Sequence, residues 1–192
     1  MTPPIYVLRH GQTIWNAEHR IQGRLDSALT EQGRAQARAQ NEILSKIDLS
    51  GFQALCSPQG RAFHTASIAL EGIFGLIKTD ARLAEISVGA WEGFRRDEVV
   101  MDQLVDESEE SALDLYQRAP GGEGFHGLHA RCSDFLADLR HPSVLVTHGI
   151  TSRMLRLIVL NKDISEIGTL PGGQGVVYHL ENGEMHRLSI GA

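Results

Sequence analysis

Residues 5–11, IYVLRHG, and residues 144–149, VLVTHG, follow the same pattern near the two ends of the chain. Each begins with a run of apolar, largely β-branched residues, which is typical of a buried strand, and ends with a histidine and a turn-forming glycine. In open α/β sheets, ligands bind beyond the carboxyl ends of the strands. The pattern therefore predicts that His10 and His148 open onto the same crevice.

The stretches around these two segments alternate between strand and helix patterns. Strands are expected at 5–8, 54–56, 144–147, 176–181 and 184–190, and helices at about 31–46, 58–70, 127–139 and 151–160. Thr30 and Ser57 are the expected N-caps of the first two helices, with Pro58 at a first helical position. Asn182-Gly183 predicts a type I′ hairpin. This order predicts an α/β fold, with a mostly parallel central sheet and helices on both faces.

Length and composition limit the possible classes of protein. The chain has 192 residues, of which 42% are apolar, and this size fits a single domain over 1–192. The net charge of −6 argues against a nucleic-acid partner. The absence of a signal-like start, of a long apolar run and of paired cysteine motifs around Cys56 and Cys132 favours a cytoplasmic location away from membranes. The sequence leaves open whether the protein is a monomer or a homodimer.

A third strand end contributes Arg61, which lies in the first turn of its expected helix. The helix dipole disfavours a cation there by up to about 1 kcal/mol, and a residue that breaks a local rule at a strand end is a candidate for function. Arg9 adds a second guanidinium beside His10. Each feature alone has an ordinary structural explanation, but together two arginines, two histidines and a helix N-terminus favour a phosphate site. Glu85, in a loop, would deliver a proton to a leaving group.

Six acidic residues and no basic residue lie within 102–114. The simpler interpretation is a solvated helix face or loop. The alternative is a small acidic lid insertion that overhangs the site and repels highly anionic ligands. Under this alternative, the ligand is a small phosphate monoester rather than a polyanion.

Several blocks of the sequence resemble the histidine phosphatase superfamily, whose best-known branch is cofactor-dependent phosphoglycerate mutase. They are 9–16 (RHGQTIWN), 21–26 (IQGRLD), 29–33 (LTEQG), Ser57-Pro58 with Arg61-Ala62 and Thr65-Ala66, 83–85 (LAE) with Gly89 and 91–93 (WEG), and 147–149 (THG) with Arg153. The blocks span almost the whole chain, so the combined match is specific. The resemblance implies a phosphoglycerate mutase-like fold.

The resemblance also implies a mechanism. Neutral His10 would attack phosphorus and become a phosphohistidine, while its other ring nitrogen donates to a backbone carbonyl. Glu85 would protonate the departing alkoxide and then deprotonate the attacking water. Neither a metal nor a cofactor is required, because arginines supply the positive charge. Residues expected to hold the phosphoryl oxygens or contact the substrate are Arg9, Arg61, His148, Asn16, Thr13, Gly149, Gln22 and Gly23.

The segment between Glu85 and His148 is shorter than the resemblance implies for mutases. This favours a phosphatase of small phosphorylated metabolites, in a branch that includes broad-specificity and α-ribazole phosphatases. Two departures from the family pattern leave the substrate open. Gly124 stands where the Pro-Gly-Gly-Glu-Ser motif has its serine, and Ile150 stands where many of these phosphatases carry a second glycine.

Three alternatives compete with this interpretation. The first is a cofactor-dependent phosphoglycerate mutase, and the second is a non-catalytic protein that binds a phosphorylated ligand. The third is a zinc enzyme using His126, His129 and Cys132, which the simpler interpretation of a partly exposed helix face outweighs. Four aromatic residues are equally compatible with a substrate mouth and with core packing, namely Trp91, Phe94, Tyr116 and Phe125.

Overall fold

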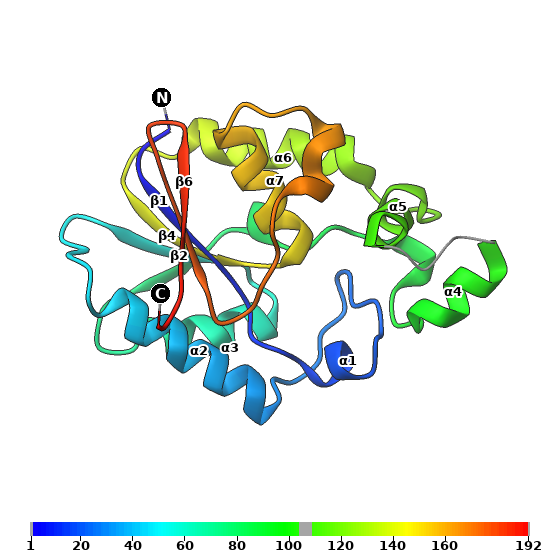
Figure 1. The fold of residues 1–192 in the computed structure, drawn as a ribbon, viewed down its shortest axis with the longest axis horizontal. Coiled ribbons are helices and arrows are strands. Elements are labelled where there is room, and N and C mark those ends of the chain that lie inside the picture. Colours follow the sequence, from blue (N-terminus) through cyan, green and yellow to red (C-terminus); the bar gives the residue numbers. More distant parts are fainter. Residues whose placement is uncertain (1, 104–108, 192) are drawn as a thin grey trace.

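The computed structural model describes residues 2–103 and 109–191. A six-stranded sheet lies at its centre, in the order β3-β2-β4-β1-β5-β6 (Figure 1). The strands are β1 (Ile5–Arg9), β2 (Gln53–Cys56), β3 (Ile77–Thr79), β4 (Ser143–Thr147), β5 (Val177–Glu181) and β6 (Glu184–Leu188). The first four pair in parallel, whereas β5 and β6 run antiparallel at one edge. The predicted mostly parallel sheet is therefore confirmed.

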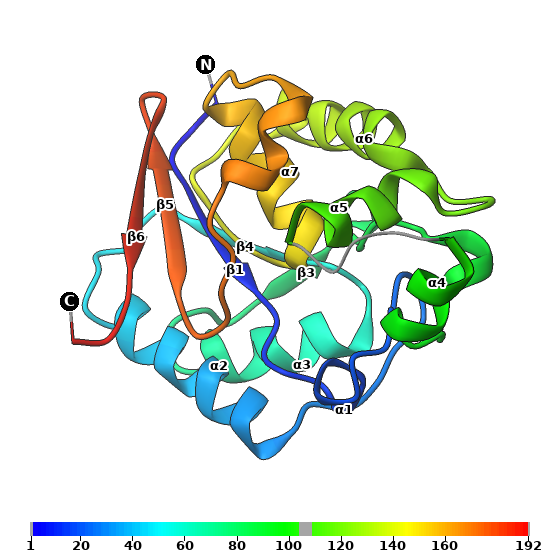
Figure 2. The ribbon, with the colours of Figure 1, turned by 45° about the vertical axis from the view of Figure 1, so that its right-hand side comes forward.

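Helices cover both faces of this sheet, as the two ribbon views show (Figures 1 and 2). The helices are α1 (Ile14–Ala17), α2 (Glu31–Leu44), α3 (Gly60–Ala69), α4 (Arg96–Gln103), α5 (Glu109–Arg118), α6 (Gly124–Asp138) and α7 (Gly149–Val159). Helices α2 and α3 pack on one face, and α6 and α7 on the other. The α/β architecture expected from the alternation of patterns is present.

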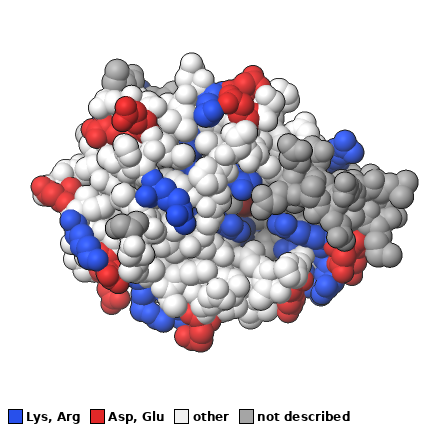
Figure 3. Space-filling model, in the orientation of Figure 1, with Lys and Arg blue, Asp and Glu red and all other residues white. Residues whose placement is uncertain are grey.

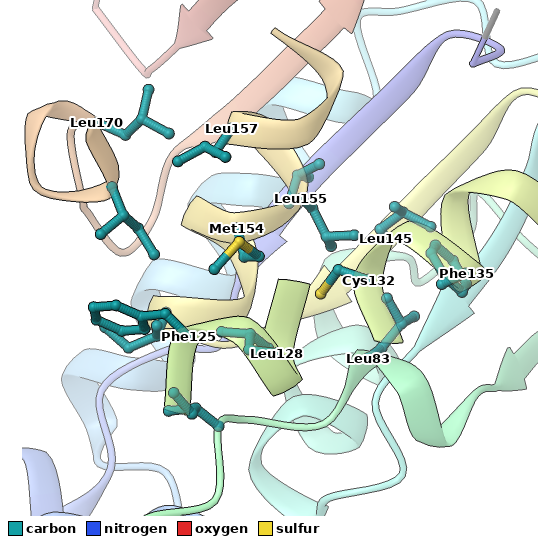
Figure 4. Packing of buried hydrophobic residues seen from close by; sticks show 14 of the residues in the cluster. Leu83, Phe125, Leu128, Cys132, Phe135, Leu145, Met154, Leu155, Leu157 and Leu170 are labelled. Atoms are coloured by element: carbon teal, nitrogen blue, oxygen red, sulfur yellow. The ribbon is translucent and has the colours of Figure 1, made fainter. Parts of the chain in front are cut away.

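The central strands are buried on both faces because successive side chains point in opposite directions. In β1, Ile5 and Val7 join the apolar cluster that contains α6 and α7, while Tyr6 and Leu8 join the cluster that contains α2 and α3. Figure 4 shows the first cluster, in which Cys132 of α6 packs among leucines and Phe135. Each such side chain contributes about 1.5–3 kcal/mol when fully buried.

One of the two predicted N-caps is present and the other is wrong. Thr30 Oγ1 accepts from Gly33 N at 3.0 Å at the start of α2. Helix α3 begins at Gly60 instead of Pro58, and Gln59 occupies its N-cap without a side-chain capping bond. The hydroxyl of Ser57 accepts from Gln59 N at 3.2 Å in a local turn that precedes the helix, and it also lies 2.7 Å from His148 Nε2.

The remaining elements agree with expectation to within a few residues at their ends. Helix α6 begins three residues before Gly127. The hairpin between β5 and β6 turns at Asn182 and Gly183 with φ of +53° and +78°, as a type I′ turn requires. Strand β3 and helices α1, α4 and α5 are additional to the predicted elements. Part of the expected acidic lid, residues 104–108, lies outside the described residues.

Every helix in the described part of the chain is too short or too polar to cross a bilayer.

Helix α2 approaches the segment after His10 so closely that only glycine fits at two positions. A Cβ built on Gly33 would overlap the carbonyl oxygen of Gln12, and one on Gly11 would overlap the carbonyl oxygen of Gly33. These obstacles are backbone atoms, which cannot rotate away as the end of a flexible side chain can. The two glycines therefore set the distance between α2 and the strand end that carries His10.

We expect Gly33→Ala to destabilise the protein by roughly 1–3 kcal/mol, because overpacking outweighs the gain of about 1 kcal/mol from better helix propensity. Urea unfolding measures the difference. Gly75→Ala is the matched control, because a Cβ there meets no atom within 4 Å, and it should change stability by no more than about 0.5 kcal/mol. A Gly33→Ala protein as stable as the wild type would contradict the steric argument.

Candidate active site

The sheet brings the two strand-end histidines together. Strands β1 and β4 are neighbours, with Arg9 paired to Thr147, so His10 and His148 leave the sheet side by side. The backbone N–H of His10 donates to the carbonyl of Thr147 at 2.9 Å. The two imidazole rings lie edge to face with their centroids 5.2 Å apart.

The hydrogen bonds of His10 assign its two ring nitrogens different states. Nδ1 lies 2.7 Å from the carbonyl oxygen of Gly11, which can only accept, so Nδ1 carries the proton. Nε2 therefore keeps its lone pair, which accepts a hydrogen bond from Nε of Arg61 at 3.3 Å. An imidazole held in this tautomer presents Nε2 as a nucleophile.

Both site histidines are neutral at pH 7. Burial lowers the pKa of His10 well below the usual 6.5, and the positive charges of Arg61 and Arg9 lower it further. Burial has the same effect on the pKa of His148, again assisted by Arg61. Desolvation and nearby cations both disfavour the imidazolium, so the two causes act in the same direction.

Arg61 is held against His10 by one loop. Its buried guanidinium donates from Nη1 to the carbonyl of Leu25 at 2.6 Å and from Nη2 to the carbonyl of Gly23 at 2.9 Å. Nη1 also forms an ion pair with Asp26 at 3.1 Å. The loop therefore compensates the buried charge and aims Nε at the ring of His10.

Arg9 and Gly149 meet at the start of α7. A Cβ on Gly149 would lie 3.3 Å from Cζ of Arg9, so the glycine leaves room for the guanidinium. Burial lowers the pKa of Arg9, while the charge of Glu85 opposes this shift. Arg9, Glu85 and Gly149 line the same cleft, so one bound ligand can contact all three.

Glu85 binds to the N-terminus of α7. Its Oε1 accepts from N and Oγ1 of Thr151, each at 3.0 Å, and its Oε2 accepts from Ile150 N at 3.2 Å. Negative charge is favoured at a helix N-terminus. Helix α7 thus positions the carboxyl group beside Gly149 and Arg9.

Two buried polar atoms of the site have no hydrogen-bond partner among the described residues. These atoms are Nε of Arg9 and Nδ1 of His148. Leaving a buried polar atom unpartnered costs about 1–3 kcal/mol. An anionic group that accepts from them would remove that cost, which is the behaviour expected of a phosphoryl group.

The expected substrate-contacting residues Thr13 and Asn16 form a capping box at α1. Thr13 is fully buried, and its Oγ1 accepts from Asn16 N at 3.1 Å. The Oδ1 atom of Asn16 accepts from Thr13 N at 3.2 Å and from Nε2 of Gln174 at 3.4 Å. Both bonds orient the Asn16 amide, and its Nδ2 has no partner in the described part of the chain. Direct contact of either residue with a substrate stays a prediction.

Gly23 and Gln22 lie in the loop that holds Arg61. The carbonyl of Gly23 accepts from Arg61 and from Nε2 of Gln59, so its observed role is to build the site. The φ of Gly23 is +50°, a value that favours glycine. Gln22 is buried, and its Oε1 has no partner among the described residues. Whether Gln22 or Gly23 contacts a substrate stays a prediction.

Four side chains that support the site were not predicted as site residues from the sequence. Ser57 contacts His148, Asp26 pairs with Arg61, and Gln59 Oε1 accepts from Glu85 N at 2.7 Å. Gln174 Nε2 donates to the carbonyl of His10 at 3.0 Å. Asp26 and Ser57 lie within the motif blocks, which is a usable signal. For Gln174 the only signal is its glycine-rich surroundings.

A cleft of about 1170 Å³ extends from the site. Arg9, Glu85 and Gly149 form part of its wall, and its other charged lining residues in the described part of the chain are Arg96, Arg153, Arg156 and Asp163. In Figure 3, lysine and arginine side chains surround a hollow near the middle of the drawn face. The excess of arginine agrees with a site of positive charge within an acidic protein.

The aromatic residues of uncertain role separate into two groups. Tyr116 and Phe125 line the cleft, and Phe125 also packs in the core. Trp91 packs against the core from its edge, and Phe94 is half exposed. Two of the four aromatic residues therefore lie where a substrate mouth was expected, and core packing accounts for others.

The three candidate zinc ligands on α6 do not converge. Burial among apolar residues raises the pKa of Cys132 to about 12, which disfavours the thiolate that zinc requires. His126 is exposed, whereas Cys132 is completely buried. Among the described residues, no three histidine, cysteine or acidic side chains are grouped to hold a metal ion.

Comparisons with known proteins agree with this geometry. Residues 5–188 match the model of the histidine phosphatase superfamily, branch 1. The chain is 37% identical to "Probable phosphoglycerate mutase GpmB" of Enterobacter sp. (strain 638) over 156 residues, which cover 76% of this chain and 69% of that protein.

Solved structures are also similar. A mycobacterial glucosyl-3-phosphoglycerate phosphatase complexed with VO3 has a TM-score of 0.80 and 28% identity, covering 97% of this chain and 96% of the other. The α-ribazole phosphatase of Shigella flexneri has a TM-score of 0.80 over 98% and 96% of the two chains. At 23% identity, that second likeness shows a common fold alone.

We expect the buried neutral histidines to make stability depend on pH. Below pH 6.5 the histidine side chain is protonated in the unfolded chain, whereas buried His10 stays neutral in the folded protein. Protonation therefore favours the unfolded state, and the free energy of unfolding falls as pH drops. The slope contributed by one such histidine reaches about 1.4 kcal/mol per pH unit. His10→Gln should therefore show a shallower decline than the wild type in urea unfolding between about pH 7 and pH 5. The exposed His64→Gln variant should keep the wild-type slope, and equal slopes for all three proteins would contradict the burial argument.

Proposed function

Because the chain belongs to branch 1 of the histidine phosphatase superfamily, we propose that it hydrolyses phosphate monoesters of small metabolites through a phosphohistidine on His10. The observation that carries this proposal is the state of His10. Its Nδ1–H is committed to the Gly11 carbonyl at 2.7 Å, which leaves the lone pair of Nε2 facing Arg61. A neutral, oriented imidazole among guanidinium groups suits attack on phosphorus.

In the first step, Nε2 of His10 attacks phosphorus and the bond from phosphorus to the ester oxygen breaks. The negative charge spreads over the three equatorial oxygens. Arg9 and Arg61 stabilise these oxygens electrostatically, and the unpartnered Nδ1 of His148 adds a hydrogen bond. In this proposal Glu85 enters the step protonated and delivers its proton to the departing ester oxygen, so the alcohol leaves neutral and Glu85 becomes a carboxylate.

In the second step, water attacks the phosphohistidine. Glu85, now a carboxylate, accepts a proton from this water as it attacks phosphorus. The bond from phosphorus to Nε2 breaks, and its electron pair returns to His10 as the ring lone pair. Inorganic phosphate leaves, and both His10 and Glu85 regain their starting states. The arginines supply the charge stabilisation, so the proposed reaction uses neither a metal nor a cofactor.

The cleft supports a phosphatase of bulkier monoesters more than a mutase of phosphoglycerate. Its volume of about 1170 Å³ exceeds that of ordinary ligand sites, which measure roughly 300–1,000 Å³. A three-carbon acid would fill little of that space, whereas a sugar or a similar alcohol would contact its apolar walls. The similarity to a probable phosphoglycerate mutase supports the mutase as the second candidate. A non-catalytic binding role is disfavoured, because the nucleophile and the acid are both present.

We expect His10→Ala to abolish hydrolysis of p-nitrophenyl phosphate while the wild type turns it over with a chelator present. Loss of the attacking nitrogen removes the covalent route altogether. Release of p-nitrophenol is the measurement, and quenched wild-type enzyme should carry an acid-labile, base-stable phosphoryl group. His141→Ala, an exposed histidine that precedes β4 at the end of the strand opposite His148, should retain wild-type activity. An active His10→Ala protein or chelator-sensitive turnover would refute the mechanism.

The fate of the phosphoryl group distinguishes the two candidate activities. With 3-phosphoglycerate labelled in its phosphate, a phosphatase releases labelled inorganic phosphate, and we expect this result. A mutase instead moves the label to the 2-position and releases little phosphate. Phosphorus NMR resolves the three species in one sample, so dominant 2-phosphoglycerate would overturn our preference.

A further inference from the structure

Ser57 forms a hydrogen bond with the second site histidine from a different strand end. It directly follows β2, and its Oγ lies 2.7 Å from His148 Nε2. Both side chains are completely buried. A contact of this length between a hydroxyl and a ring nitrogen is a hydrogen bond whose direction depends on which atom holds the proton.

The partners of Ser57 decide that direction. Its Oγ accepts from Gln59 N at 3.2 Å. Among the described residues, the only other acceptor near its proton is Gln59 Oε1, at 3.5 Å, and that oxygen already accepts from Glu85 N at 2.7 Å. If His148 donated to the hydroxyl, the proton of Ser57 would be buried with no acceptor at a good distance, which is costly.

We infer that Ser57 donates its proton to Nε2 of His148 and thereby fixes His148 as the Nδ1–H tautomer. Nδ1 is the atom of His148 that has no partner among the described residues. Its N–H is then a ready donor for a phosphoryl oxygen bound at His10. Ser57 is a positioning residue, and its effect on catalysis rests on the proposed phosphatase function, whereas the tautomer does not.

The tautomer matters because the ring of His148 is neutral. Burial lowers its pKa well below 6.5, so it cannot attract an oxyanion as an imidazolium would. Its contribution comes from one N–H dipole, and the opposite tautomer would turn a lone pair toward the anion. In His10 the hydrogen bond lies on the other side of the ring. The Gly11 carbonyl holds the proton on Nδ1, and Nε2 keeps the lone pair for the proposed attack.

Nitrogen NMR of the ¹⁵N-histidine-labelled protein without substrate tests the assignment. Two-bond couplings to the ring carbon protons distinguish a protonated from an unprotonated ring nitrogen, and His148→Gln identifies the signals. We expect protonated Nδ1 in the wild type, a mixture of tautomers in Ser57→Ala, and the wild-type pattern in Ser57→Thr, which keeps the hydroxyl. Protonated Nε2 in the wild type, or an unchanged tautomer in Ser57→Ala, would overturn the inference. If Ser57→Ala does not fold, Ser57→Cys, with its weak thiol donor, replaces it.

Kinetics with p-nitrophenyl phosphate test the consequence. Loss of one oriented oxyanion donor costs about 10²- to 10³-fold in kcat, so partial loss of the correct tautomer should lower kcat by about tenfold or more, with KM little changed. Ser57→Thr should restore kcat. Ser143→Ala is the matched control, because Ser143 is a buried, hydrogen-bonded serine at the opposite end of β4, and it should leave kcat unchanged. A fall in kcat in Ser57→Ala that Ser57→Thr does not restore would count against the positioning role. An inactive wild type with protonated Nδ1 would refute the phosphatase function and leave the tautomer assignment intact.

Discussion

The site depends on the burial of one guanidinium group. The side chain of Arg61 is 1% exposed, and burying a charge costs several kcal/mol unless partners replace water. Its partners are the carbonyls of Gly23 and Leu25 and the carboxylate of Asp26. Asp26 also accepts from the backbone N–H of Arg61, which fixes the start of α3. The loop, the helix and the nucleophile are therefore held by a single residue.

Around this cation, the same side-chain type acquires two different roles. His10 and His148 are both buried and neutral, yet one meets a backbone carbonyl and the other meets a hydroxyl. An acceptor on Nδ1 leaves Nε2 of His10 with the lone pair that the proposed attack on phosphorus requires, and a donor on Nε2 would make Nδ1 of His148 a hydrogen-bond donor. The hydrogen-bond partner of each ring thus decides which nitrogen holds the proton. For His10 this partner is the carbonyl of the next residue, and for His148 it is Ser57 from a distant part of the chain.

The features that could be predicted from the sequence are those that depend on a short stretch of residues. The paired strand ends, the Thr30 cap and the Asn182-Gly183 turn all have short-range signals, and the structure contains them. Strand β3 has three residues, two of them exposed, so it lacks the apolar run that marks a strand. The start of α3 differs from the prediction because Ser57 Oγ closes a local turn with Gln59 N, and the helix begins only after that turn. Supporting amides such as Gln174 were missed because their partners are defined only once the chain has folded.

The strand order has a consequence for how the protein is made. Strand β4 lies between β1 and β2, both of which precede it by many residues in the chain. A growing polypeptide therefore has no second histidine to place beside His10 until late in synthesis, and β1 and β2 gain their common neighbour only then. Contacts between distant parts of a chain form slowly. The proposed active site can therefore be completed only after most of the chain has been made, and a product truncated before His148 would lack part of it.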